Sequence, residues 1–317
     1  MSKNQMPACV KKTTIGGQAI LEGIVMKGPK RTCVVVRKPD GTLVTEERPT
    51  SQPKSRFWKL PVCRGAYSLF TAMKDGLADI DYSSQFIEDG ADEKPSKFEQ
   101  WLERRLGSEK LEKAVTAFAM VLGIAIPVAL FMLLPSFVGG LLPADVPNVA
   151  RNLFEGLLRI VIFLCFMWSV SHMEDIRRTF EYHGAEHKTI FCYEAGLPLT
   201  VENVRKMPRF HPRCGTSFLF VLIIVATLVS SLIFSLVTVT NPFLRALTHL
   251  IILPLVVGIS YECNRYAGRH DNLLCRVLRW PGLMIQRLTV FEPDDSMIEV
   301  AIEGMQRVIP EDDSDVW

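Results

Sequence analysis

The chain has 317 residues, of which 48% are hydrophobic, and a formal net charge of +2. The near balance of charge excludes a dedicated nucleic-acid-binding protein, because such domains are usually strongly basic. Eight cysteines are spread along the chain without the density of a disulfide-rich scaffold.

Residues 1–95 are predicted to form an N-terminal cytoplasmic region that opens with a glycine-rich segment at residues 16–29. The glycine spacing favours close backbone approaches over a regular helix, and it matches no phosphate-binding loop. A Pro-Asp-Gly turn then separates the apolar residues 33–37 from residues 43–47. Turn residues between two such runs predict a β-hairpin.

Two helices are predicted between this hairpin and the first long apolar run. Apolar residues recur at helical spacing from Ala66 to Ile80, which predicts an amphipathic helix. Its polar face holds Lys74, Asp75 and Asp79. A helix on an anionic lipid surface would have more lysine and arginine there, so we expect this helix to pack on protein. Ser96 and Glu99 form a capping box, which predicts a juxtamembrane helix over residues 96–113.

Four apolar segments predict four transmembrane helices, two within residues 114–172 and two within residues 217–261. Apolar runs longer than about 18 residues are typical of bilayer spans rather than of buried core helices. The predicted spans are Ala114–Leu134, Leu153–His172, Ser217–Val239 and Phe243–Tyr261. Pro127 and Pro135 are expected to kink or end the first of them.

The charges in and around these spans predict the topology. Basic residues are concentrated before the first span, in the loop at residues 173–216 and in the tail at residues 262–317. By the positive-inside rule, both termini and this loop lie in the cytoplasm of a multi-pass protein of the inner (plasma) membrane. Glu155 and Arg159 of the second span are expected to pair on the helix surface. Transport is disfavoured, because spans one and three lack the ionisable residues of a substrate pathway.

The C-terminal tail predicts an interfacial segment followed by a capped helix. Residues 273–288 mix leucines, Trp280 and arginines, as segments at a membrane surface do. Ser296 and Glu299 form a second capping box, and Pro310 is expected to end the helix that follows. The fold class is therefore an α-helical integral membrane protein with about four transmembrane helices and a small cytoplasmic α+β portion.

The cytoplasmic loop at residues 173–216 carries the motif that points to chemistry, because His183, Glu186 and His187 form an H-x-x-E-H sequence. On a helix, two histidines four residues apart lie on one face and can share a metal ion. Glu186 lies beside that face, where it can take a proton from a metal-bound water. This is the inverted form of the zinc metallopeptidase motif. The competing interpretation is that both histidines only hydrogen-bond within a polar loop.

A catalytic zinc site usually has three protein ligands and one open position, so a third ligand is needed. His211 and Cys214 follow in an H-x-x-C spacing just before the third span. His211 is the first choice and Cys214 the alternative, while Glu194 and Glu262 are weaker candidates. Imidazole and thiolate ligands favour zinc, and iron or manganese stay open.

Other charged and polar residues carry two interpretations each. Arg213 and Arg265 are candidates for holding an anionic substrate, and both also fit the positive-inside pattern. Glu22 is either a functional carboxylate or a structural partner of the basic loop. His249, inside the fourth span, is expected to hydrogen-bond another helix rather than bind metal.

Four blocks of sequence carry a family resemblance. They are GGQAILEGIVMKGP at 16–29, YHGAEHKTI at 182–190, RFHPRCGTSFL at 209–219 and PGLMIQRLTVFEPDDSMIEVAI at 281–302. With these blocks the chain resembles the YqhQ family of bacterial membrane proteins over nearly its whole length. Val290 departs from the pattern, since a second threonine is expected there. The family is catalogued as predicted metal-dependent enzymes without a settled substrate. The resemblance therefore implies the architecture and the importance of the histidine loop, not a reaction.

These observations predict a membrane-tethered, metal-dependent enzyme, a hydrolase that activates water at the cytoplasmic face. His183, His187, His211 and Cys214 are the candidate ligands for a divalent metal, with zinc preferred, and Glu186 would be the general base. The alternative is a non-catalytic membrane scaffold or assembly factor whose His/Cys loop is structural. The expected partner is the lipid bilayer, joined by a further membrane protein if the chain is a scaffold. No nucleic acid is expected, and the oligomeric state stays open.

Overall fold

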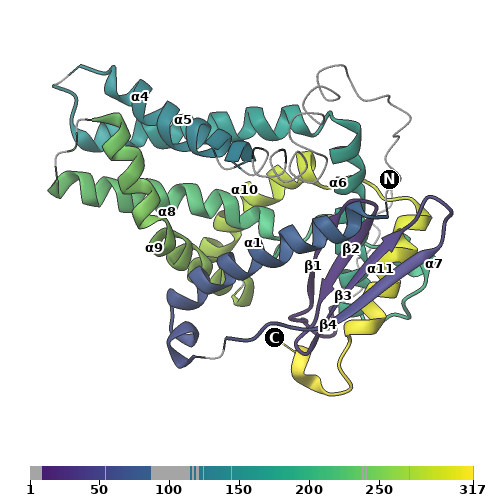
Figure 1. The fold of residues 1–317 in the computed structure, drawn as a ribbon. Coiled ribbons are helices and arrows are strands. Elements are labelled where there is room, and N and C mark those ends of the chain that lie inside the picture. Colours follow the sequence, from purple (N-terminus) through teal and green to yellow (C-terminus); the bar gives the residue numbers. More distant parts are fainter. Residues whose placement is uncertain are drawn as a thin grey trace, which may run out of the picture. The chain divides into compact units, whose positions relative to one another are not determined.

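The computed structural model describes residues 9–86, except residue 54, and residues 115, 118 and 121–316, except residues 124, 144, 238, 240 and 271 (Figure 1). The helix predicted over residues 96–113 and the start of the first predicted span lie outside these described residues. The chain divides into two compact units. Unit 1 comprises Met1–Ile87, Leu164–Val225 and Pro254–Trp317, and unit 2 comprises Glu88–Phe163 and Ala226–Leu253.

The described residues are mostly helical, with a small antiparallel sheet near the N-terminus (Figure 1). The strands are β1 (Gly16–Ile20), β2 (Gly23–Lys27), β3 (Arg31–Arg37) and β4 (Leu43–Pro49). The helices and helical turns are η1 (Arg56–Lys59), α1 (Cys63–Ser84), η2 (Ala129–Leu133), α4 (Leu134–Gly140), α5 (Asn148–Val170), α6 (Glu174–Glu194), α7 (Val201–Arg205), α8 (Gly215–Leu236), α9 (Pro242–Arg269), α10 (Leu273–Thr289), α11 (Asp295–Val308) and η3 (Asp313–Asp315).

The sheet of unit 1 has the strand order β1-β2-β3-β4, and each neighbouring pair is antiparallel. The predicted hairpin is confirmed as β3 and β4. The glycine-rich segment forms β1 and β2, which its sequence pattern does not predict. The reason is that glycines interrupt β1, and that β2 is buried on both faces and so lacks the alternation of polar and apolar residues that marks a half-exposed strand.

Helices cover both faces of the sheet. On one face, Ile24 and Val35 belong to a buried cluster that also contains residues of α6 and α11. On the other face, Val25 and Val34 pack with Tyr82 of α1. Because apolar burial is the main stabilising force in folding, this packing fixes α6 against the sheet. It is α6 that carries the histidine motif.

The predicted C-terminal helix is present as α11, but its cap differs from the prediction. Asp294 is the N-cap, and its side chain accepts a hydrogen bond of 2.9 Å from the backbone N–H three residues later. The hydroxyl of Ser296 donates to Asp294, and Glu299 forms an ion pair with Arg37 at 2.9 Å. An aspartate two residues earlier therefore takes the role expected of the serine, since either side chain can accept such a bond.

The predicted amphipathic helix is present as α1, but its apolar stripe does not pack on the described part of the protein. The residues that α1 buries are small or polar, including Gly65 and Asp79. The side chains of Phe70, Met73 and Leu77 are 71%, 58% and 61% exposed. Small residues let the neighbouring backbones approach closely, so the helix packs through them and leaves these three apolar side chains outside.

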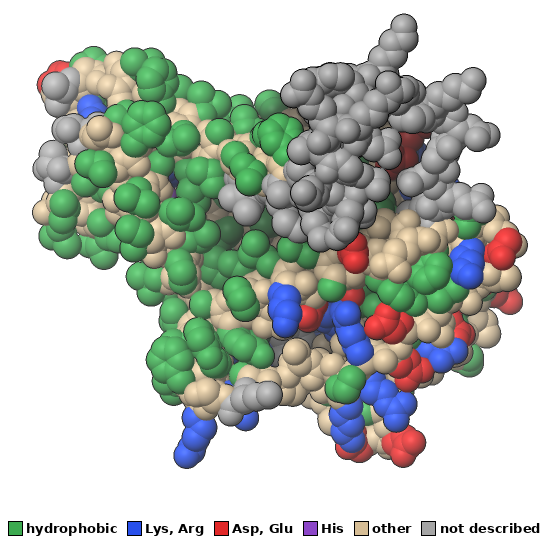
Figure 2. Space-filling view, viewed as in Figure 1, with side chains coloured by type: hydrophobic (Ala, Val, Ile, Leu, Met, Phe, Trp, Pro, Cys, Tyr) green, Lys and Arg blue, Asp and Glu red, His purple; other side chains and the backbone are tan. Residues whose placement is uncertain are grey.

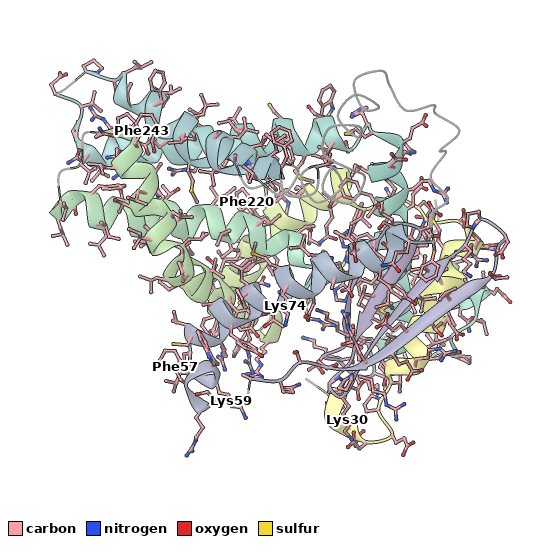
Figure 3. All side chains as sticks on the ribbon, in the orientation of Figure 1. Lys30, Phe57, Lys59, Lys74, Phe220 and Phe243 are labelled. Atoms are coloured by element: carbon pink, nitrogen blue, oxygen red, sulfur yellow. The ribbon has the colours of Figure 1, made fainter. Side chains whose placement is uncertain are left out.

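Among the described residues, four helices are long and apolar enough to cross a membrane, as the sequence predicts: Val121–Gly140, Asn148–Val170, Phe218–Leu236 and Pro242–Arg269. Hydrophobic side chains cover the visible surface of α4 and α5 (Figure 2), and Phe243 of α9 is 72% exposed (Figure 3). The first helix does not end at Pro135 but continues to Gly140. The π-helical turn η2 directly precedes this proline. Pro135 cannot donate a backbone hydrogen bond, and the carbonyl oxygen of Phe131, four residues earlier, accepts one of 3.0 Å from Nε of Arg159 instead.

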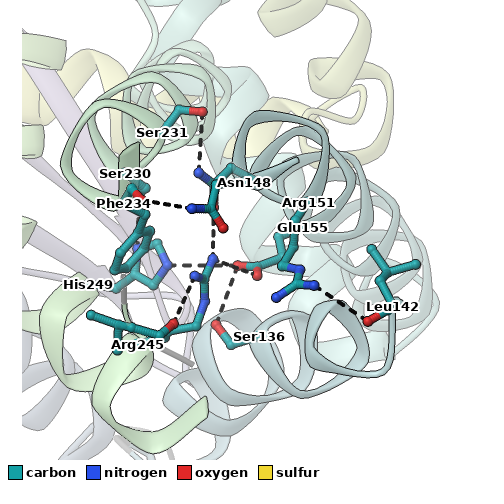
Figure 4. Close-up of polar contacts among 12 residues, drawn as sticks. Ser136, Leu142, Asn148, Arg151, Glu155, Ser230, Ser231, Phe234, Arg245 and His249 are labelled. Atoms are coloured by element: carbon teal, nitrogen blue, oxygen red, sulfur yellow. Dashed lines mark hydrogen bonds and ion pairs between the residues drawn. The ribbon is translucent and has the colours of Figure 1, made fainter. Parts of the chain in front are cut away.

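Unit 2 contains a buried polar cluster that joins α4, α5, α8 and α9 (Figure 4). Glu155 and Arg159 are 1% and 7% exposed, so they do not pair on a helix surface as expected. Glu155 accepts hydrogen bonds from Arg245 at 2.8 Å and from Arg159 at 3.4 Å. His249 bonds to Arg159 and to Ser230 of α8, which confirms its expected helix-to-helix role. Arg245, which lies 90 positions after Glu155, helps to bury this pair. The spacing of Glu155 and Arg159 alone places them on the helix surface, because it carries no trace of that distant partner.

Candidate metal site

The two motif histidines lie on one face of α6, and their ring centroids are 4.4 Å apart. Between them stands Gly184, where an added Cβ atom would lie 2.0 Å from the carbonyl oxygen of Phe291. Any other residue at this position would push that backbone away. Gly184 therefore lets the chain beyond α10 pass directly against the helix turn that carries His183.

Backbone carbonyl groups fix the tautomer of both histidines. The Nδ1 atom of His183 lies 3.0 Å from the carbonyl oxygen of Thr289. The Nδ1 atom of His187 lies 2.6 Å from the carbonyl oxygen of Arg209. A carbonyl oxygen can only accept, so each Nδ1 carries the proton and each neutral ring keeps a lone pair on Nε2. Histidine ligands of metal ions are commonly oriented in this way.

Cys214 brings its sulfur to the same point. Its Sγ atom lies 3.2 Å from Nε2 of His183. Ligand atoms of His183, His187 and Cys214 all lie within 4.8 Å of one another. The backbone N–H of Thr216, in the first turn of α8, points at the sulfur from 3.4 Å. Without a metal the thiol proton can be shared with His183, and a metal ion would replace that proton.

His211, the first choice for the third ligand, lies beside this group and not in it. Its ring centroid is 5.5 Å from that of His187. The Nδ1 atom accepts a hydrogen bond of 3.3 Å from the backbone N–H of Arg213, and Nε2 lies 3.8 Å from a carboxylate oxygen of Glu194. Burial lowers the pKa of His211 to about 4, which keeps the ring neutral. Both ring nitrogens thus lie near groups other than Cys214.

A glutamine of α10 holds the loop that carries His211. Gln286 is fully buried, and its side chain accepts from the backbone N–H of His211 and donates to the backbone carbonyl of His211, both at 2.8 Å. The loop conformation that brings Cys214 to the histidines is therefore fixed by side-chain bonds from a distant helix. No local spacing within the loop could have shown this.

The side chain of Glu186 is hydrogen-bonded to the first strand of the sheet. Its side chain is 5% exposed, and its Oε1 atom accepts a hydrogen bond of 3.0 Å from the backbone N–H of Gly17 in β1. Burial raises the pKa of Glu186 and outweighs the opposing effects of the neighbouring His183 and of the Gly17 hydrogen bond. A buried carboxyl group with a raised pKa is typical of residues that exchange protons.

Gly17 supplies that hydrogen bond only because it has no side chain. A Cβ atom here would lie 2.8 Å from the carbonyl oxygen of Val25 and 2.9 Å from Cγ of Glu186. We expect Gly17→Ala to lower the free energy of unfolding by about 1–3 kcal/mol, the usual cost of overpacking. Chemical unfolding of the purified protein in one detergent measures this. The matched control is Gly16→Ala, because a Cβ atom there meets nothing within 4 Å. Equal losses in the two variants would contradict the account.

A cavity of about 540 Å³ opens over this group. His183, Glu186, His187 and Cys214 line it together with the segment from Thr13 to Gly17 and residues near the end of α9. His211 and Arg213 also reach it. The candidate ligands and the candidate base therefore share one space large enough for a small-molecule group.

The other acidic candidates have structural partners. Glu194 forms an ion pair with Arg213, and Glu262 forms one with Arg64. Glu22 accepts two hydrogen bonds from Arg178, at 2.5 and 2.6 Å. These bonds support its interpretation as a structural partner of the basic loop. None of the three lies in the group of ligand atoms found among the described residues.

Three groups of the site cannot be predicted from the sequence pattern. They are the carbonyl groups of Thr289 and Arg209 and the amide group of Gly17, all of them backbone atoms. A fourth part, Arg269, lies four residues after Arg265 and lines the cavity with it. That spacing places the two arginines on one helix face, which the sequence alone is enough to predict.

A family model described as "Protein of unknown function (DUF1385)" matches residues 60–311. The chain is also 33% identical over 322 residues to a protein named "Uncharacterized protein YqhQ" of Bacillus subtilis (strain 168), a match that covers 98% of this chain and 95% of that protein. No solved structure matches the chain. The matched region includes His183, His187 and Cys214. The chain therefore belongs to the DUF1385 family.

Proposed function

We propose that the protein is a membrane-anchored, metal-dependent hydrolase. Its metal ligands are Nε2 of His183, Nε2 of His187 and Sγ of Cys214. The observation that carries the proposal is the pair of Nδ1–H bonds to backbone carbonyl groups, which leaves both Nε2 lone pairs free beside the sulfur. Two imidazoles and one thiolate are a ligand set that suits zinc.

The residues around the metal site have separate roles in this proposal. Zinc held there would lower the pKa of a bound water and make it a nucleophile. Glu186 is the general base, because its carboxylate lines the same cavity and is held by the amide of Gly17. Thr289 and Arg209 orient the two imidazoles through their carbonyl groups.

The number of donors favours an enzyme over a structural metal site. A structural zinc site is usually closed by four protein ligands, whereas a catalytic site keeps one position open. For His211, the predicted further ligand, to close the site, its ring would first have to leave the Arg213 amide and the neighbourhood of Glu194. The three-donor arrangement therefore supports the catalytic alternative more than the scaffold.

Elemental analysis of protein purified without chelator tests the metal. We expect about one zinc ion per chain, which His187→Ala and Cys214→Ser both lose, since each removes a ligand. His172→Ala is the control, because this histidine is exposed and lies in the turn before α6. Circular dichroism of each variant confirms that the helices remain. A wild-type protein without stoichiometric metal would overturn the proposed function.

For localisation we propose a multi-pass plasma-membrane protein with both termini in the cytoplasm. Four apolar helices and the placement of basic residues support this topology. We expect reporter fusions after Gly140 and after Asn241 to lie outside. Fusions after Gly196 and at Trp317 should lie in the cytoplasm. An external fusion after Gly196 would place the metal site on the wrong side for this proposal.

A further inference from the structure

Part of the lining of the cavity comes from the last turns of α9. Tyr261, Asn264, Arg265 and Arg269 all line it. Their spacing of three, four and eight residues from Tyr261 places them along one face of the helix. The face that carries the arginines and the cluster of candidate metal ligands thus border one space.

The charges that line the cavity are predominantly positive. Glu186 is its acidic residue, and Arg213, Arg265 and Arg269 are its basic residues. Arg213 is paired with the buried carboxylate of Glu194. Within the described part of the chain, neither Arg265 nor Arg269 has a side-chain hydrogen bond or an ion pair.

The nearest acidic residue on α9 does not neutralise these arginines. Glu262 influences Arg265 electrostatically, but its carboxylate is already bonded to both Nε and Nη2 of Arg64. Two guanidinium groups one helical turn apart therefore face the cavity with their donors available. Two neighbouring guanidinium groups match the several oxygens and the double charge of a phosphate group better than the two oxygens of a carboxylate.

We propose that Arg265 and Arg269 bind a phosphate group of the substrate, with Asn264 as an additional donor. The substrate is thus a phosphorylated molecule, either a phospholipid headgroup or a soluble phosphate compound. This inference rests on the proposed function, because it places the phosphate beside the metal site that acts on the molecule.

Calorimetric titration of the full-length protein in detergent tests the proposal. The probes are dihexanoyl phosphatidic acid, inorganic phosphate and dihexanoyl glycerol, which has the same chains without phosphate. The double variant Arg265→Gln/Arg269→Gln is expected to bind the phosphate probes at least about tenfold more weakly, because it loses charge-assisted hydrogen bonds. The control is Arg287→Gln, an exposed arginine of α10 that does not line the cavity.

The probes also distinguish the source of the phosphate. Arginine-dependent binding of phosphatidic acid alone supports a lipid headgroup, and equal dependence for inorganic phosphate supports a soluble compound. Binding of dihexanoyl glycerol as tight as that of phosphatidic acid overturns the proposal. Phosphate binding that is absent, or unchanged in the double variant, overturns it too.

A second set of titrations separates this inference from the proposed function. The Cys214→Ser variant, treated with chelator, is titrated with the same probes. Arginine-dependent phosphate binding in that protein supports the anion site even if no metal is found. Retained metal in the arginine double variant, together with unaltered phosphate binding, leaves the metal site standing and refutes the phosphate site.

Discussion

Glu186→Gln is expected to keep the metal and the fold and to lower the catalytic rate by about 10²–10⁴-fold, the usual contribution of a general base. Glutamine has the size of glutamate, and its side-chain oxygen can still accept the hydrogen bond from Gly17. It cannot take a proton from a metal-bound water. The substitution therefore removes the proposed base without removing any of the three proposed ligands.

His187→Ala is the comparison for this variant. It removes a ligand atom from the group and leaves the carbonyl of Arg209 without its imidazole partner. We expect it to lose the metal and to melt at a lower temperature than Glu186→Gln. Metal content, thermal melting and complementation of a deletion strain at matched protein levels measure the three effects. If Glu186→Gln loses metal as readily as His187→Ala, Glu186 is a ligand or a structural support, and its assignment as base is wrong.

The elements with a strong local signal are predictable from the sequence. The four apolar helices follow from long apolar runs, and the β3–β4 hairpin follows from its Pro-Asp-Gly turn. The helices α1 and α11 follow from apolar residues at helical spacing. The strands β1 and β2 have no such signal, because glycines interrupt the first and burial on both faces removes the alternation of the second.

For the candidate site, spacing identifies residues but not the direction of their side chains. The helical period places His183 and His187 on one face of α6, and the structure confirms that their rings lie side by side. His211 and Cys214 are three residues apart in a loop, where no period applies. Which of them turns toward the histidines depends on Gln286, about 75 positions later in the chain. Long-range hydrogen bonds of this kind leave no local trace in the sequence.

The same limit applies to the buried polar cluster of unit 2. Considered within α5 alone, Glu155 and Arg159 form the i,i+4 ion pair that is common on exposed helix surfaces. Their burial depends on Arg245 and His249, which come from α9. A glutamate in a candidate span is nevertheless a signal in itself, because ionisable residues in a bilayer are expensive and need partners.

Glu155→Gln is expected to lower the free energy of unfolding by about 3–5 kcal/mol, as when one partner of a buried ion pair is removed. The carboxylate of Glu155 accepts hydrogen bonds from the guanidinium groups of Arg159 and Arg245. These two arginines are only 7% and 3% exposed. The four candidate spans contain only one further acidic residue, Glu262, which pairs with Arg64. No other carboxylate of the spans can replace Glu155.

Chemical unfolding in a fixed detergent measures this loss against a control on the same helix. Arg151 lies one turn before Glu155, and its Nη2 atom donates to the carbonyl oxygens of Leu142 and Pro143. We expect Arg151→Gln to cost about 0.5–1.5 kcal/mol, the net value of an ordinary hydrogen bond. A Glu155→Gln variant that is no less stable than Arg151→Gln would show that the two buried arginines do not need the carboxylate.

A triple variant separates the cost of unpaired charge from the cost of lost packing. Replacing Glu155, Arg159 and Arg245 together by leucine removes all three charges and keeps apolar volume between the helices. Buried ion pairs can often be exchanged for apolar residues without loss of stability, so we expect this variant to be more stable than Glu155→Gln. If the triple variant is instead the least stable, the hydrogen bonds of Arg159 to Phe131 and His249 stabilise the unit more than its charge balance does.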